Sequence, residues 1–281
     1  MTPILICARG GSKGIPKKNL SMLGPWSLLE WSIHLALLYT TPENIFLSSD
    51  SEDILSIGNF YGITTIRRPE EFATDSSPEE LSWKHFINNY LDHDQLNAPL
   101  IILPPTSPFR SLELLDESIS SICTQIPLIA SAYLSSRSPW FNMVKNVSNN
   151  YYQVVIPDSG YFRRQDAPIT FDLTTCFFTL IPSSFMKIKE SRYELPFSIV
   201  KVDREQCLDI DEPYDLDRAR MYWNHLGTDF EPSKRTNVML TIEHIESLIA
   251  NDEKKLKLYC ASDCPQYRKA LLYLMGYIRK S

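Results

Sequence analysis

The chain has 281 residues, a formal net charge of −6 at pH 7, and 43% hydrophobic and 22% charged residues. This balance is ordinary for a globular protein of one large domain with an appendage, and it argues against a general basic surface for nucleic acid. No apolar run reaches the ~18 residues that a membrane-spanning helix needs, so we expect no membrane partner.

Short apolar runs alternate with helical patterns over roughly the first 130 residues, as in a layered sheet built from strand–helix–strand units. The pattern predicts strands at 3–8, 44–48, 64–67, 99–103 and 128–133. It predicts helices at 28–39, 52–61, 78–91 and 112–124. This alternation favours an α/β fold whose sheet is mainly parallel.

Beyond residue 134 the periodicity weakens, and we interpret residues 135–175 as an excursion from the main sheet. Weak alternation at 151–156, preceded by Asn149-Asn150, favours a hairpin within it. The pattern then predicts a strand at 176–181, extended structure at 198–210 and a helix at 213–223.

A polar stretch at 227–237, interrupted by Pro232, marks a boundary. We therefore predict a main domain at 1–228 and a helical extension at 229–281, to which the sequence assigns no role. The N-terminus has no basic region before its apolar run, so we expect no signal peptide. Most of the six cysteines lie singly in apolar or strand-like runs, which suits reduced thiols in a cytoplasmic protein.

The segment 8–19 directly follows the first predicted strand, where open α/β sheets bind ligands. Its three glycines let backbone N–H groups approach a ligand, and cations such as Arg9, Lys13 and Lys18 suit a triphosphate. The spacing is neither that of a P-loop nor that of the dinucleotide-binding fingerprint. The alternative is a solvated basic turn, which so dense a cluster disfavours.

Two acids, Asp209 and Asp211, end the last predicted extended segment. In extended structure the side chains at i and i+2 point to one side, about 6–7 Å apart, so both carboxylates converge while Ile210 faces the core. Two carboxylates beside phosphates suit Mg²⁺, which completes its coordination with phosphate oxygens and water. The alternative is that Asp211 only caps the helix predicted at 213–223.

Two weaker clusters add polar groups. Thr106, Ser107 and Arg110 follow the strand predicted at 99–103 and offer hydroxyls and a guanidinium fork to an anion. A rigid turn that caps the next helix explains these three residues equally well. Residues 163–166, Arg-Arg-Gln-Asp, lie in the excursion, where a surface charge run is the alternative.

The segments at 8–19, 48–52, 68–75, 105–110, 164–165 and 209–211 resemble, in this order, the motifs of the acylneuraminate cytidylyltransferases, the CMP-sialic acid synthetases. The resemblance implies a three-layer αβα nucleotidyltransferase fold with a mixed, mainly parallel sheet. It implies transfer of CMP from CTP to the anomeric hydroxyl of a nonulosonic, sialic-acid-like sugar acid, with Mg²⁺ as cofactor and pyrophosphate as product. It also implies a homodimer whose excursion reaches into the partner's site.

The same resemblance implies roles for individual residues. Catalysis would use Arg9, Lys18 and Asp211, and the metal ligands would be Asp209 and Asp211. The nucleotide would contact Ala8, Arg9, Gly10, Ser12, Lys13, Lys18, Asn19, Arg68 and Ser77. The acidic sugar would contact Thr106, Ser107, Arg110, Arg164 and Gln165. No general base stands out, and Asp211 or a metal-bound hydroxide is the best candidate.

Two positions depart from the family's pattern. The family usually has glutamine where this chain has Pro104, and an Asn-Gly-Ala run where it reads Leu173-Thr174-Thr175-Cys176. Both positions line the sugar pocket in the family, so a modified sugar of the legionaminic or pseudaminic type is expected rather than N-acetylneuraminate. Another acid sugar or nucleotide is one alternative. A non-catalytic binding protein is another, which the intact acid pair disfavours.

Overall fold

The computed structural model describes residues 2–74, 77–157 and 160–225, and the extension predicted at 229–281 lies outside them. The strands are β1 (Ile4–Cys7), β2 (Met22–Leu23), β3 (Trp26–Ser27), β4 (Ile45–Ser49), β5 (Thr64–Arg67), β6 (Leu100–Ile102), β7 (Leu128–Leu134), β8 (Val144–Ser148), β9 (Tyr151–Val154), β10 (Phe171–Leu180) and β11 (Phe197–Lys201). The helices are α1 (Leu28–Tyr39), α2 (Glu52–Phe60), α3 (Glu79–Tyr90), α4 (Leu112–Ser121), α5 (Pro182–Phe185) and α6 (Pro213–His225). In this part of the chain, no helix is long and apolar enough to cross a membrane.

The largest sheet has the strand order β11-β7-β10-β6-β1-β4-β5. Neighbouring strands are parallel except where β10 pairs with β6 and with β7, which confirms the predicted mixed, mainly parallel sheet. Strands β4 and β5 lie on one side of β1, and the next strand in the chain, β6, pairs with the other side of β1. This reversal places a crevice at the carboxyl ends of β1 and β6, where sheets of this kind bind ligands.

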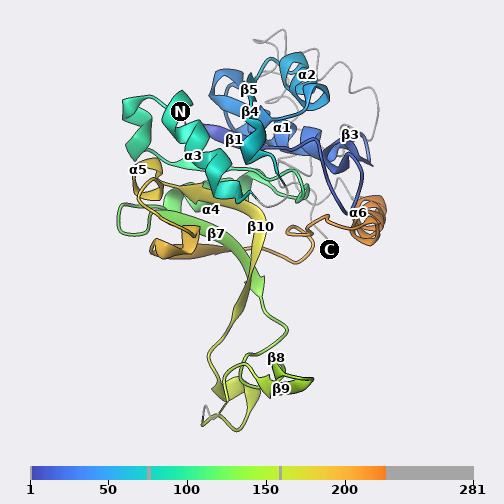
Figure 1. The fold of residues 1–281 in the computed structure, drawn as a ribbon, viewed down its shortest axis with the longest axis vertical. Helices are drawn as coiled ribbons and strands as arrows, with labels where there is room; N and C mark the ends of the chain where they lie inside the picture. Colours follow the sequence, from blue (N-terminus) through green and yellow to red (C-terminus); the bar gives the residue numbers. More distant parts are fainter. Residues whose placement is uncertain (1, 75–76, 158–159, 226–281) are drawn as a thin grey trace, which may run out of the picture.

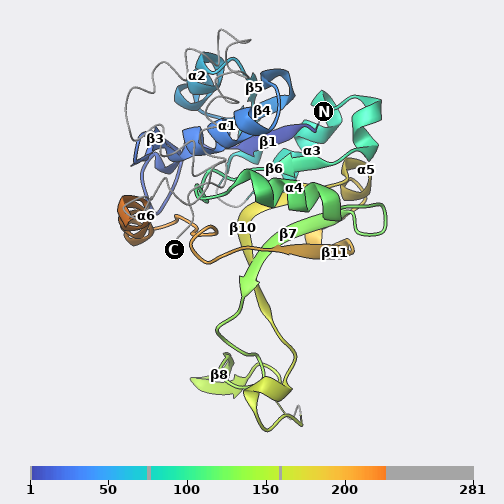
Figure 2. The ribbon, with the colours of Figure 1, turned by 180° about the vertical axis from the view of Figure 1, so that it is seen from behind.

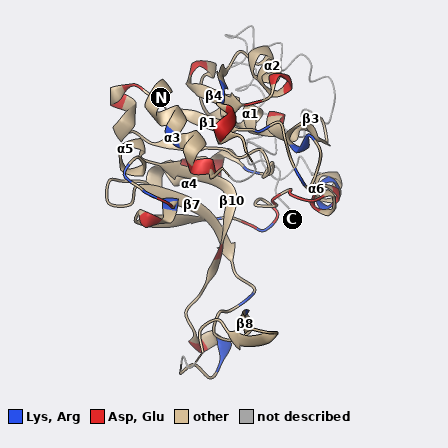
Figure 3. Ribbon diagram, in the orientation of Figure 1, with Lys and Arg blue, Asp and Glu red and all other residues tan. Residues whose placement is uncertain are grey.

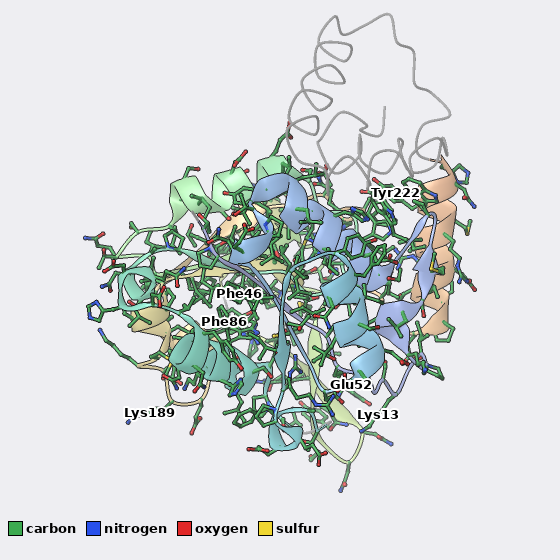
Figure 4. The ribbon with its side chains drawn as sticks, turned by 90° about the horizontal axis from the view of Figure 1, so that it is seen from above. Lys13, Phe46, Glu52, Phe86, Lys189 and Tyr222 are labelled. Carbon is green, nitrogen blue, oxygen red and sulfur yellow. The ribbon has the colours of Figure 1, made fainter. Side chains whose placement is uncertain are left out.

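Helices cover both faces of this sheet (Figures 1 and 2). Ile4 and Ile6 of β1 belong to one buried cluster and Leu5 to the other, because successive strand side chains point to opposite faces. The first cluster includes residues of α1, α2, α4 and α6, and the second includes residues of α3 and α5. In the second cluster, Phe46 and Phe86 pack with ring centroids 4.8 Å apart (Figure 4). Three layers result, as predicted.

The observed elements differ from the predicted ones mainly near the site. Helix α1 and strand β5 have the predicted bounds. Strand β10 begins before the predicted 176–181, because its first part pairs with the end of β7 at the base of the excursion. The stretch predicted as extended at 198–210 forms a strand only in β11, because the chain then turns, with the Cys207 N–H donating to the Asp203 carbonyl at 3.2 Å.

Between β7 and β10 the chain leaves the sheet and projects away from the body (Figures 1 and 2). Strands β8 and β9 form an antiparallel hairpin at its far end. Asn149 and Asn150 join them with φ angles of 39° and 63°, left-handed values that asparagine tolerates, so the predicted turn is confirmed. Every residue of β8 is exposed, so the hairpin has little core of its own.

Candidate active site

The loop at 8–19 is held at the carboxyl end of β1 by contacts with the start of α2 and within itself. Gly10 donates its N–H to Asp50 Oδ1 at 2.8 Å, and a Cβ on Gly10 would lie only 2.7 Å from Ser51 Cβ. Asn19 is buried, and its Nδ2 donates to the Arg9 carbonyl at 2.9 Å. The loop therefore has a defined shape in the crevice where a ligand is expected.

The polar side chains of this loop differ in their surroundings. Lys17 has a left-handed backbone, with φ of 52°, and its Nζ lies 2.9 Å from Asp53 Oδ2. Ser12 is half-buried, whereas Lys13 is exposed at the edge of the molecule (Figure 4). Arg9 lines a small hollow together with Lys17. Ala8, the first residue of the loop, is fully buried and can offer a ligand only its backbone.

The loop meets the acidic segment that leads into α6 (Figure 3). Lys18 Nζ lies 2.6 Å from Asp211 Oδ1; the lysine side chain is 12% exposed and the aspartate side chain 66%. A Cβ on Gly14 would lie 2.2 Å from the Asp211 carbonyl oxygen, so only glycine permits this approach. The fold thus joins two motifs that are far apart in the sequence.

Asp209 is half-buried beside this contact. Its Oδ2 accepts a hydrogen bond from Thr175 Oγ1 at 2.8 Å, and its Oδ1 is buried without a hydrogen-bond partner. Burial raises the pKa of Asp209, while hydrogen bonds from Thr106 and Thr175 oppose that increase. Ile210 is fully buried and donates its N–H to the Thr106 carbonyl at 2.9 Å. The predicted alternation between acid and core residue is confirmed.

The two carboxylates suit a metal ion that draws its other ligands from elsewhere. In the part of the chain that the structure describes, no group of three or more His, Cys, Asp or Glu residues is placed so that it could hold a metal ion by itself. Asp209 has an unpartnered oxygen, and Asp211 is largely exposed with a single lysine contact. Such a pair fits Mg²⁺, which binds one or two carboxylates together with phosphate oxygens and water.

Arg110 differs from its predicted role as a sugar ligand. It is completely buried, and its Nη1 donates to the carbonyls of Pro104 and Cys176, both at 2.7 Å, while its Nη2 donates to Ser32 Oγ on α1. The guanidinium therefore joins the loop after β6 to β10 and α1 instead of facing the crevice. Ser107 is also completely buried, which leaves Thr106 as the accessible hydroxyl of this cluster.

Arg68 lies against the ends of the neighbouring strands. It is 6% exposed, and it donates from Nε to Ser48 Oγ at 3.2 Å and from Nη2 to the Ser48 carbonyl at 2.9 Å. Burial raises the pKa of the neighbouring Cys7 to about 12, and the positive charge of Arg68 opposes this increase. Ser77 donates its hydroxyl to the Glu71 carbonyl at 2.6 Å. Arg68 is thus held at the ends of β4 and β5 by hydrogen bonds from two of its N–H groups.

Arg164 and Gln165 are not brought to the crevice of their own chain. They lie in the excursion, where Arg164 Nη2 donates to the Ser136 carbonyl at 2.9 Å. They line a hollow between the two segments that connect the excursion to the sheet. Its other lining residues are Leu134, Ser135, Arg137, Ser138, Ala167, Pro168, Ile169 and Thr170. The predicted sugar ligands therefore fall into two separate groups within one chain.

Thr175 is a residue that motif reasoning did not assign to the acid pair. The stretch Leu173-Thr174-Thr175-Cys176 was singled out only as a departure from the family pattern. Thr174 points into the sheet, with its Oγ1 2.6 Å from Ser131 Oγ, whereas Thr175 bonds to Asp209. Two adjacent threonines carry no sequence signal that distinguishes these two environments.

A glycine- and lysine-rich loop after β1 meets two carboxylates at the ligand-binding edge of a mainly parallel α/β sheet, an arrangement that suits a nucleoside triphosphate and its metal ion. The sequence model of the cytidylyltransferase family matches residues 4–169, more than half of the chain. The protein belongs to this family.

Individual relatives agree with this assignment. The chain is 28% identical over 220 residues to the N-acylneuraminate cytidylyltransferase of Escherichia coli O18:K1:H7, a match that covers 76% of this chain and 50% of that protein. It is 27% identical to the CMP-N,N'-diacetyllegionaminic acid synthase of Campylobacter jejuni, with 75% and 90% covered. The chain thus spans half the length of the first relative and most of the second.

Among solved structures, a CMP:2-keto-3-deoxy-manno-octonic acid synthetase complexed with CTP superposes with a TM-score of 0.56. The superposition covers 79% of this chain and 98% of that one, at 15% identity. At this identity the likeness concerns the fold, and it confirms the predicted nucleotidyltransferase architecture.

Proposed function

We propose that the protein transfers CMP from CTP to the anomeric hydroxyl of a nonulosonic sugar acid in a Mg²⁺-dependent reaction. The observation that carries this proposal is the meeting of the loop at 8–19 with the acid pair, through Lys18 Nζ at 2.6 Å from Asp211 Oδ1. Cations and carboxylates at one point suit a triphosphate and its metal ion together. The names of the relatives from Escherichia coli and Campylobacter jejuni support an acidic sugar as acceptor.

In this mechanism the side chains position the reactants and neutralise charge. Arg9, Lys13, Lys18 and the N–H groups of the glycine-rich loop would bind the triphosphate. Asp209 and Asp211 would hold Mg²⁺, which supplies positive charge beside the phosphates. The anomeric oxygen bonds to the α-phosphorus while the bond to the bridging oxygen breaks and pyrophosphate leaves. The exposed Asp211 carboxylate is the candidate acceptor of the hydroxyl proton.

Substrate choice provides the direct test. We expect a legionaminic- or pseudaminic-type acid to exceed N-acetylneuraminate in kcat/KM by roughly tenfold to a hundredfold, the cost of one unpaired polar group. The reason is that Pro104 has no side-chain donor or acceptor where the family usually has glutamine. The measurement is pyrophosphate release at fixed CTP with a panel of nonulosonic and 2-keto-3-deoxy acids. If N-acetylneuraminate is the best substrate, Pro104 does not determine specificity.

The same assay separates the rival functions. Replacing CTP with UTP, ATP or GTP should abolish most turnover, because the loop from Arg68 to Ser77 is expected to recognise cytidine. Equal rates with another nucleotide would indicate a different nucleotidyltransferase. If no combination of nucleotide and acid sugar releases pyrophosphate while CTP still binds, the protein is a non-catalytic relative.

We further infer that the active protein is a homodimer in which each excursion completes the partner's sugar site. Two observations support this inference. Arg164 and Gln165 lie away from the crevice of their own chain, and the excursion exposes large apolar side chains, including Phe162 at 94% and Ile169 at 75%. An apolar surface of this kind marks an interaction site.

Complementation between two inactive variants tests this arrangement. Arg164→Ala and Asp211→Asn should each lose most activity, and an equimolar mixture allowed to exchange subunits should recover about a quarter of the wild-type rate. Half of the dimers then contain one copy of each variant. In such a two-fold dimer, one site combines the intact Asp211 of one subunit with the intact Arg164 of the other, while the second site carries both substitutions. One of the two sites is therefore active. Light scattering should show a dimer. A monomer, or a mixture that stays inactive after exchange, would contradict the shared site.

A further inference from the structure

Strand β10 is irregular where it passes the acid pair. Its antiparallel register with β7 is regular up to Thr174 and resumes at Phe178, so the residues between them have no opposite residue in β7. A bulge of this kind bends a strand and changes the direction of its side chains. It also removes backbone groups from the ladder, and each such group needs another partner if it is buried.

Side chains supply those partners. Phe177 N–H donates to Ser131 Oγ at 3.2 Å, and this oxygen lies 2.6 Å from Thr174 Oγ1. Cys176 N–H donates to Thr174 Oγ1 at 3.3 Å, and the Cys176 carbonyl accepts from Arg110 Nη1 at 2.7 Å. The bulge is therefore a defined conformation that depends on these particular side chains.

The bulge directs Thr175 at Asp209. Thr175 is exposed, and its Oγ1 lies 2.8 Å from Asp209 Oδ2. Thr106, in the loop after β6, fixes the backbone beside this carboxylate, because its carbonyl accepts the Ile210 N–H at 2.9 Å. A carboxylate held by a hydroxyl, next to a fixed backbone, has a restricted orientation. Groups that bond to a metal ligand in this manner tune the affinity for the metal.

We propose that Thr175 is a positioning residue for Asp209 and sets the affinity of the acid pair for a divalent cation beside CTP. The inference rests on the proposed function of this pair. The contact between Thr175 and Asp209 depends on a bulge that Ser131 and Arg110 of the same chain support. The contact is therefore a property of this chain's own sequence.

Mn²⁺ binding tests the proposal without turnover. The full chain would be titrated with Mn²⁺ in the presence of a non-hydrolysable CTP analogue, and free Mn²⁺ would be followed by its EPR signal. Thr175→Val keeps the shape of the side chain and removes the hydroxyl, so the Kd for Mn²⁺ should rise roughly tenfold to a hundredfold. Thr175→Ser keeps the hydroxyl and should retain most of the wild-type affinity for Mn²⁺. In turnover, the Mg²⁺ concentration for half-maximal rate should rise, while the rate at saturating Mg²⁺ changes less.

Thr65→Val is a matched control. Thr65 Oγ1 donates to Asn59 Oδ1 at 2.9 Å on the edge strand β5, so the variant loses a similar hydrogen bond away from the acid pair. Its Mn²⁺ affinity should equal that of the wild type, and Thr175→Ala serves as a second variant if Thr175→Val unfolds. Unchanged Mn²⁺ affinity in a folded Thr175 variant overturns the proposal. Failure of the wild type to bind Mn²⁺ beside the CTP analogue would instead overturn the metal site itself.

Discussion

Asp211→Asn should reduce kcat/KM by on the order of a hundredfold to a thousandfold, comparable to the loss of one charge-stabilising group in other enzymes. The substitution keeps the size of the side chain but removes the charge that pairs with Lys18 and would bind the metal ion. Because the Asp211 side chain is 66% exposed, we expect the free energy of unfolding to stay within ~0.5 kcal/mol of the wild type. Steady-state kinetics and a thermal melt measure the two effects.

Asp53→Asn is the matched control for this experiment. Asp53 pairs with Lys17 of the same loop at 2.9 Å, and its side chain is 61% exposed, yet it lies outside the acid pair. We expect only a small change in kcat/KM. Similar losses in both variants would indicate that loop charge, and not the acid pair, limits activity. Full activity of the wild type in EDTA would remove the metal from the mechanism.

Arg110→Met should lower the free energy of unfolding by at least about 3 kcal/mol, because two carbonyls and one hydroxyl lose a buried donor at roughly 1–3 kcal/mol each. Methionine fills much of the volume, so the loss reports mainly the hydrogen bonds that join the loop after β6 to β10 and α1. Burial lowers the pKa of Arg110 to about 10, but the side chain still carries its charge at neutral pH. Denaturant unfolding measures the change.

This experiment separates a structural Arg110 from a sugar-binding one. A ligand role would raise KM for the sugar acid and leave the melting temperature unchanged. Arg164→Met is the control, because Arg164 is exposed and its guanidinium contacts only the Ser136 carbonyl among the described residues. Its stability should stay within ~0.5 kcal/mol of the wild type. A stable Arg110→Met variant with a raised KM for the sugar would restore the original interpretation.

Local features of the sequence were sufficient to predict many of the helices and strands. Strands and helices of the first half follow from hydrophobic periodicity, which depends only on neighbouring residues, and α1 has the predicted bounds. The turn at Asn149-Asn150 follows from the tolerance of asparagine for positive φ. The loop at 8–19 and the acid pair were predicted because each is a dense, contiguous cluster at the end of a stretch whose pattern predicts extended structure.

Tertiary structure alone decided how these parts are used. Arg110 has the guanidinium expected of an anion ligand, but this group is buried and donates a hydrogen bond to the Cys176 carbonyl in the bulge of β10. Thr174 and Thr175 are identical in sequence terms, yet Thr174 lies opposite Ser131 in the regular ladder and contacts it, whereas Thr175 lies in the bulge and contacts Asp209. A bulge arises from the pairing of strands that are distant in the chain, so the local hydrophobic pattern does not predict it. Local residue patterns therefore predict which polar side chains gather near the ends of strands, and long-range packing decides which of them face the crevice.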